Sequence, residues 1–121
     1  ILGSCTKEKE PAPAPTIPIE GYWSGFYKIN GHTTNHNTAI LLRPGGTMRF
    51  YELGVRTDTM FLPSDLKLDA QWTFSNNVLK FVLSIGTQQA EISLARSDDQ
   101  KKLNGSYSVD GATAGIMEYG K

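Results

Sequence analysis

Apolar and polar side chains alternate along most of the chain from residue 20 onward. In the run 78–85, for example, Leu79, Phe81 and Leu83 fall on one side, and Lys80 and Ser84 fall on the other. A period of two places the apolar side chains on one face of a β-strand. No segment shows a helical apolar stripe with capping residues. The pattern therefore predicts an all-β domain.

Turn-forming residues separate the alternating runs at the spacing that β-hairpins need. Glycine, asparagine and aspartate tolerate the positive φ values of tight hairpin turns. These residues occur at Pro44-Gly45-Gly46, Asn76-Asn77, Gly86-Thr87, Asp98-Asp99-Gln100 and Asp110-Gly111. The pattern predicts eight strands, at about 21–29, 38–43, 47–53, 68–75, 78–85, 88–96, 102–109 and 114–119.

Eight short strands joined mostly by hairpins form a meander, and closing it into a barrel removes both exposed edges. We therefore expect a small eight-stranded antiparallel up-and-down barrel over residues 20–121, with a β-sandwich as the alternative. The stretch 54–67 is the least regular and is interpreted as a loop, a lid or a misread strand. Its apolar patch, 60–63, either plugs or covers the barrel or contacts a partner.

The first predicted strand carries Gly21-Tyr22-Trp23. This is similar to the Gly-x-Trp signature of lipocalins and other calycin barrels, and the segment 103–115 resembles the closing hairpin of small lipocalin-like domains. The resemblance covers residues 20–121 and implies a lipocalin-like barrel in which Trp23 packs over the core and closes one end. Lipocalins are longer and carry a helix after the barrel, which is not visible here. Avidin-like barrels bind biotin through several polar residues and further tryptophans. These residues find no match here, so the resemblance does not imply biotin binding.

The single cysteine lies in Ile1-Leu2-Gly3-Ser4-Cys5, so no intrachain disulfide can form. This segment resembles the end of a bacterial lipobox, in which an apolar residue and two small residues precede the cysteine that receives a lipid. Residues 6–18, TKEKEPAPAPTIP, cannot build a core and favour extended conformations. The resemblance implies a lipid on Cys5, with residues 1–19 as a lipobox remnant and tether. The alternative is a chance cysteine in a frayed terminus.

The lipoprotein resemblance also implies a location. The chain would be anchored to the bacterial outer membrane, with its barrel facing the periplasm or the cell surface. The charged residues 7–10 resemble signals that direct some Bacteroidetes lipoproteins to the cell surface; the alternative is that they only make the tether soluble.

Charge and hydropathy remove some partners from consideration. Twelve basic and twelve acidic residues cancel, and no stretch concentrates lysine or arginine. Nucleic acid is therefore not an expected partner, because binding phosphates requires a basic face. No apolar run approaches the roughly 18 residues of a transmembrane helix. We expect a monomer.

No group of residues has the setting that catalysis or metal binding requires. His32 and His36 are four residues apart, but they lie in a polar loop without a helical pattern or an obvious third ligand. The segment 111–115 has the glycine spacing of a nucleophile elbow but lies on a hairpin turn. The remaining charges are interpreted as solvated: Arg43, Arg49, Glu52, Arg56, Asp58, Asp65 and Asp69. We therefore expect no enzyme, no metal and no cofactor.

Two functions remain open. The first is a non-catalytic binding module that holds a small apolar molecule or a glycan fragment inside the barrel. Such pockets are lined by aromatic side chains, and the candidates are Trp23, Tyr27, Phe50, Trp72 and Phe81. We expect this pocket to be too small for a fatty acid, because the strands are short. The alternative is a solid-core interaction protein, similar to a protease inhibitor or a surface-complex accessory lipoprotein, that acts through its tether and the His32 loop.

Overall fold

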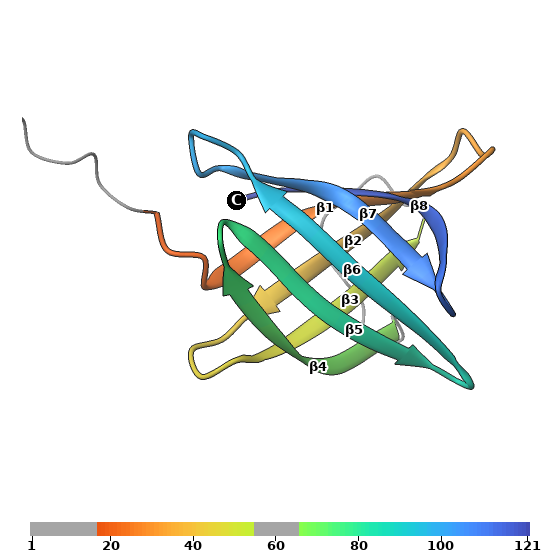
Figure 1. Cartoon of the computed structure of the whole chain (residues 1–121), viewed down its shortest axis with the longest axis horizontal. Helices are drawn as coiled ribbons and strands as arrows, with labels where there is room; N and C mark the ends of the chain where they lie inside the picture. Colours follow the sequence, from red (N-terminus) through yellow and green to blue (C-terminus); the bar gives the residue numbers. More distant parts are fainter. Residues whose placement is uncertain (1–16, 55–65) are drawn as a thin grey trace, which may run out of the picture.

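The computed structural model describes residues 17–54 and 66–121, which form a closed antiparallel barrel (Figure 1). Each strand pairs with the next along the chain, and the last pairs with the first. The predicted eight-stranded up-and-down barrel is therefore confirmed, and the sandwich alternative is not adopted. The strands are β1 (Gly21–Ile29), β2 (Asn35–Leu42), β3 (Thr47–Gly54), β4 (Leu66–Ser75), β5 (Val78–Ile85), β6 (Gln88–Arg96), β7 (Lys102–Val109) and β8 (Ala112–Gly120).

Three of the strands begin earlier than their apolar patterns predicted. β2 starts at Asn35 rather than at residue 38, and its polar start pairs with the end of β1, His36 opposite Tyr27. β4 and β8 likewise start two residues early, at Leu66 and Ala112. The additional residues join these strands because the neighbouring strand supplies main-chain partners whatever the side chain is. Residues 1–16 and 55–65 lie outside the described residues, and so do Cys5 and the apolar patch at 60–63.

The predicted turns have the geometry that their residues allow. Asn76 and Asn77 have φ values of 51° and 65°, and Asp110 and Gly111 have values of 51° and 89°. Positive φ at both central residues is typical of the hairpin turn whose twist matches that of the flanking strands. These turns let β4 pair directly with β5 and β7 pair directly with β8.

Trp23 closes one end of the barrel, here called the closed end. Its side chain is fully buried, and its indole N–H donates to the Ile19 carbonyl at 2.8 Å. The Arg96 guanidinium lies 6.0 Å from the centre of the indole, and the Lys121 ammonium lies 5.1 Å from it. These cations contact the aromatic face favourably, while burial lowers the pKa of both.

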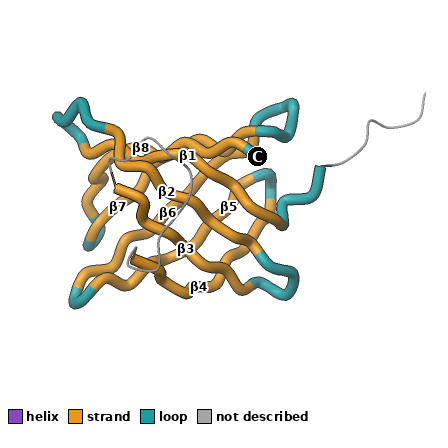
Figure 2. The backbone as a smooth tube through the Cα atoms, turned by 180° about the vertical axis from the view of Figure 1, so that it is seen from behind, coloured by secondary structure: helices purple, strands orange, loops and turns teal. Residues whose placement is uncertain are grey.

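Residues 17–20 lie across the closed end, where the C-terminus also lies (Figure 2). The Ile17 N–H donates to the Gln100 side chain at 2.8 Å, and its carbonyl accepts a hydrogen bond from Arg96. Lys121 donates to the Pro18 and Glu20 carbonyls. Residues 17–19, which the sequence pattern placed in the tether, therefore pack on the barrel. No described helix is long and apolar enough to span a membrane.

Candidate functional site

The five aromatic residues predicted to line a pocket all belong to the barrel interior, but three of them are packed into its core. Trp23, Phe50 and Phe81 are 0%, 3% and 3% exposed. Tyr27 and Trp72 are partly buried and pack against this core. The Trp72 indole N–H also donates to the Thr47 and Arg43 carbonyls, at 2.9 and 3.1 Å. In this arrangement the side chains fill the barrel rather than surround an open space.

Away from the closed end, the interior becomes polar. The hydroxyl groups of Thr38 and Tyr119 lie 2.7 Å apart, and both residues are buried. The Tyr27 hydroxyl hydrogen-bonds to Glu52, and the Tyr27 ring stacks on His36 with centroids 4.8 Å apart. The interpretation of Glu52 as a solvated charge is therefore wrong. The sequence pattern missed it because Glu52 continues the inward face of β3 two residues after Phe50.

Burial keeps the tyrosines of this cluster in their neutral form. Burial raises the pKa of Tyr119, and the nearby Glu52 carboxylate raises it further, while the Thr38 hydrogen bond lowers it somewhat. Burial is also the largest cause of the raised pKa of Tyr27, followed by the charge of Glu52. An anionic tyrosine would lose its hydration here and face a carboxylate. The cluster therefore consists of neutral hydroxyl groups around one acid.

The raised pKa of Tyr119 predicts a loss of stability in alkaline solution. The unfolded chain releases this proton near pH 10.0, whereas the folded chain holds it to higher pH. The stabilisation is therefore complete below pH 10 and is lost as the pH rises toward the folded pKa, by up to about 1.4 kcal/mol per pH unit. Urea unfolding of the wild type should show this decline, and Tyr119→Phe should reduce its slope, while the raised pKa of Tyr27 maintains the rest. An unchanged slope in Tyr119→Phe would contradict the assignment.

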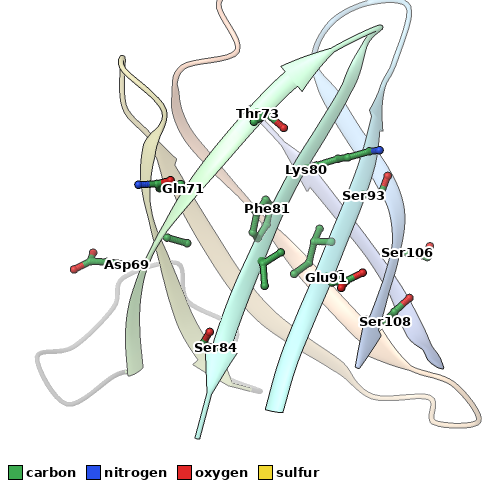
Figure 3. A pocket seen from close by; sticks show the side chains of 13 residues that line it. Asp69, Gln71, Thr73, Lys80, Phe81, Ser84, Glu91, Ser93, Ser106 and Ser108 are labelled. Atoms are coloured by element: carbon green, nitrogen blue, oxygen red, sulfur yellow. The ribbon is translucent and has the colours of Figure 1, made fainter. Parts of the chain in front are cut away.

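A hollow of about 740 Å³ lies on the outside of the barrel, over β4 to β7 (Figure 3). We call it the wall hollow. Outward-facing side chains of the four strands form its sides, and three inward-facing residues, Ala70, Phe81 and Ile92, also line it. Phe81 is thus the one predicted pocket residue that reaches this hollow. The sequence reasoning missed the hollow because outward-facing serine and threonine look like an ordinary solvated face.

The polar side chains of the wall hollow are available to a ligand. Asp69, on its rim, pairs with Arg49 at 2.7 Å, and Arg49 lowers the pKa of Asp69. The other polar residues make no side-chain hydrogen bond or ion pair with any residue in the described ranges: Gln71, Thr73, Lys80, Ser84, Glu91, Ser93, Ser106 and Ser108. They present hydroxyl, amide, ammonium and carboxylate groups on one surface, around an apolar floor.

The histidines do not form a metal site within the described residues. His36 lies on β2, where its ring stacks on that of Tyr27. His32 lies in the turn that follows β1, and its main-chain N–H donates to the Ile29 carbonyl at 2.9 Å. Across residues 17–54 and 66–121, no group of three histidine, cysteine, aspartate or glutamate side chains could hold a metal ion.

Comparison with protein-family models and with curated proteins finds no match for the chain, so the case for a site rests on its geometry.

Proposed function

We propose that this protein is a non-catalytic binding protein that holds its partner on the outside of a filled barrel, in the wall hollow. One observation carries the proposal: the interior is occupied by packed side chains, while the wall has a hollow with unpartnered polar groups. Its volume of about 740 Å³ falls within the range of ligand sites. This favours an interaction protein, with the wall hollow as its contact surface in place of the tether and the His32 loop, over a module that holds a small apolar molecule among Trp23, Phe50 and Phe81.

A glycan fragment in the wall hollow is the second candidate. One row of outward-facing residues crosses the hollow. It consists of Thr73 on β4, Lys80 on β5, Ser93 on β6 and Ser106 on β7, each opposite the next. The hydroxyl groups of Thr73, Ser93 and Ser106 can both donate to and accept from a sugar. The exposed side chain of Val82, 44% accessible, would contact its apolar face.

For its location, we propose that the lipid on Cys5 anchors the chain to the bacterial outer membrane, on the periplasmic or the surface side. The support is the lipobox-like segment 1–5 and the Pro-Ala segment that follows it. Residue 17 lies at the closed end, and the wall hollow lies on the side of the barrel. A tether that joins the barrel at its closed end would leave the wall hollow facing along the membrane surface.

Blocking the wall hollow should abolish binding. Val82→Arg places a long cation inside it, and Tyr22→Arg places the same side chain on β1, outside the hollow, where the original residue is 42% exposed. With N-acetylated oligosaccharides and short peptides as probes, we expect at least about tenfold weaker binding for Val82→Arg and little change for Tyr22→Arg. Amide chemical shifts of the whole chain would report both affinity and location.

Two results would contradict this proposal. One is a set of ligand-induced chemical-shift changes centred on Tyr27 and Trp72, inside the barrel. The other is equal binding by Val82→Arg and the wild type.

A further inference from the structure

The barrel wall has an opening between β4 and β5. These strands share four residue pairs, from Ser75 opposite Val78 to Trp72 opposite Phe81, whereas β5 and β6 share eight. Beyond the last pair, residues 66–71 pair only with β3, and residues 82–85 pair only with β6. Figure 3 shows the two strands separating toward the end that carries Asp69 and Ser84.

The main chain of β4 presents hydrogen-bonding groups to this opening. Alternate residues of an antiparallel strand direct their N–H and C=O groups to the same neighbour. The Trp72 N–H donates to the Gly46 carbonyl, on the β3 side. The groups of Asp69 and Gln71 therefore point the other way, toward β5, where no residue pair extends past Trp72 and Phe81.

The same reasoning applies to β5. The Asn77 carbonyl accepts from the Arg96 N–H, so the odd-numbered residues of β5 direct their main-chain groups toward β6. Ser84 then directs its groups toward β4. Two short strand edges thus face each other across the opening, with Asp69 and Gln71 on β4 and Val82 and Ser84 on β5.

The opening and the wall hollow coincide. Asp69, Ala70 and Gln71 on one side and Phe81, Val82 and Ser84 on the other all line the hollow. Main-chain N–H and C=O groups strongly require partners, and a free strand edge is a template for another extended chain. Resting on the function proposed above, we infer that the wall hollow takes an extended peptide segment of a partner protein, which adds as a strand to the free edge of β4.

The lining also determines which side chains such a segment needs. Successive residues of a strand point to opposite faces. One set would point inward, onto Ala70, Phe81 and Ile92, and must be apolar. The other set would point outward beside Lys80 and Glu91, which carry opposite charges, and is polar. The partner segment is therefore an extended run of alternating apolar and polar residues.

A second copy of this chain fits the edge less well. The other neighbouring strands share at least six residue pairs in the described barrel, so no other free edge of similar length is available to donate. Two copies could meet only through the short edges of β4 and β5 at the opening. Sedimentation of the unliganded chain as a dimer through that edge would overturn the inference.

The test uses a fluorescent peptide of about seven residues, with alternating valine and threonine between terminal lysines. Gln71→Pro removes the main-chain N–H that faces the opening and leaves the β3 ladder intact, because that ladder uses the even-numbered residues. Gln71→Ala removes only the side chain. Because the Gln71 side chain lines the hollow, Gln71→Ala measures the contribution of that side chain alone. With fluorescence anisotropy on the full chain, we expect Gln71→Pro to weaken binding about tenfold more than Gln71→Ala does.

Methylated peptides test the same point on the unaltered protein. N-methylation at alternate residues, whose N–H groups face β4, should weaken binding about tenfold, and N-methylation at the intervening residues should have little effect. The inference of an added strand would be overturned if N-methylation weakened binding equally at all positions. It would also be overturned if Gln71→Pro and Gln71→Ala weakened binding equally.

No binding of the peptide at about 1 mM would also overturn it. In that case, oligosaccharide binding that Val82→Arg abolishes would leave the proposed function standing. If neither probe responded to Val82→Arg, both proposals would fail.

Discussion

Replacing Gly25 by alanine should unfold the barrel or lower its free energy of unfolding by at least about 3 kcal/mol. Gly25 lies opposite Tyr119, where β1 meets β8 and the barrel closes. A Cβ atom at this position would lie 1.8 Å from the Glu118 carbonyl oxygen and 2.7 Å from the Tyr119 Cα. Both atoms belong to the main chain, and no side-chain rotation can move a Cβ. Relief therefore requires the two strands to separate. Urea unfolding would measure the loss.

Gly120→Ala is the matched control, because it makes the same change on the neighbouring strand. Its Cβ would meet the Lys101 carbonyl oxygen at 3.9 Å, an ordinary contact. We expect a change within about 0.5 kcal/mol. If both variants were as stable as the wild type, β1 and β8 could not approach as closely as the structure has them. A selective loss in Gly25→Ala would show that β1 and β8 approach closely, across the barrel order from the opening at β4–β5.

Replacing Cys5 by serine should release the protein from the membrane almost completely. A serine hydroxyl cannot take the thioether-linked lipid that the lipobox resemblance implies. Each buried methylene of an acyl chain contributes about 0.8 kcal/mol, and two or more chains make anchoring firm. The chain has one cysteine, so no second residue can replace it as the lipid site. The measurement is the partition of the chain between membrane and soluble fractions after expression behind a bacterial lipoprotein signal sequence.

Ser4→Ala controls for changes in the same segment, because it keeps a small residue before the cysteine. We expect this variant to stay in the membrane fraction. A Cys5→Ser protein that still sediments with membranes would show that another part of the chain holds it there, and the anchor proposal would be wrong.

The fold was predictable because its signals are local. Leu79, Phe81 and Leu83 alternate with polar residues wherever one face of a strand is buried, and Asn76-Asn77 can adopt the positive φ that a hairpin turn needs. Repeating these two signals along the chain specifies a meander. Closure satisfies both edges of a meander, which favoured the barrel over the sandwich.

The position of Glu52 was not predictable in the same way. A glutamate next to an irregular stretch looks solvated, yet Glu52 is half-buried and hydrogen-bonded to Tyr27. Its partner is on another strand, and a single sequence contains no direct sign of which residues meet across a closed barrel. Residues 17–19 pose the same problem, because Arg96 and Lys121, which hold that segment, come from the far part of the chain.

By itself, the sequence determined the turns and the approximate strands, because both depend on residues a few positions apart, through the period of two and the φ preferences of turn residues. It favoured a closed barrel over a sandwich, and the resemblance to lipocalins implied that Trp23 closes one end. Only the tertiary structure decided that β4 and β5 separate after Trp72 and Phe81, and that unpartnered polar groups surround the resulting hollow. Where two strands part depends on the curvature of the whole wall, because every strand must also pair with its other neighbour.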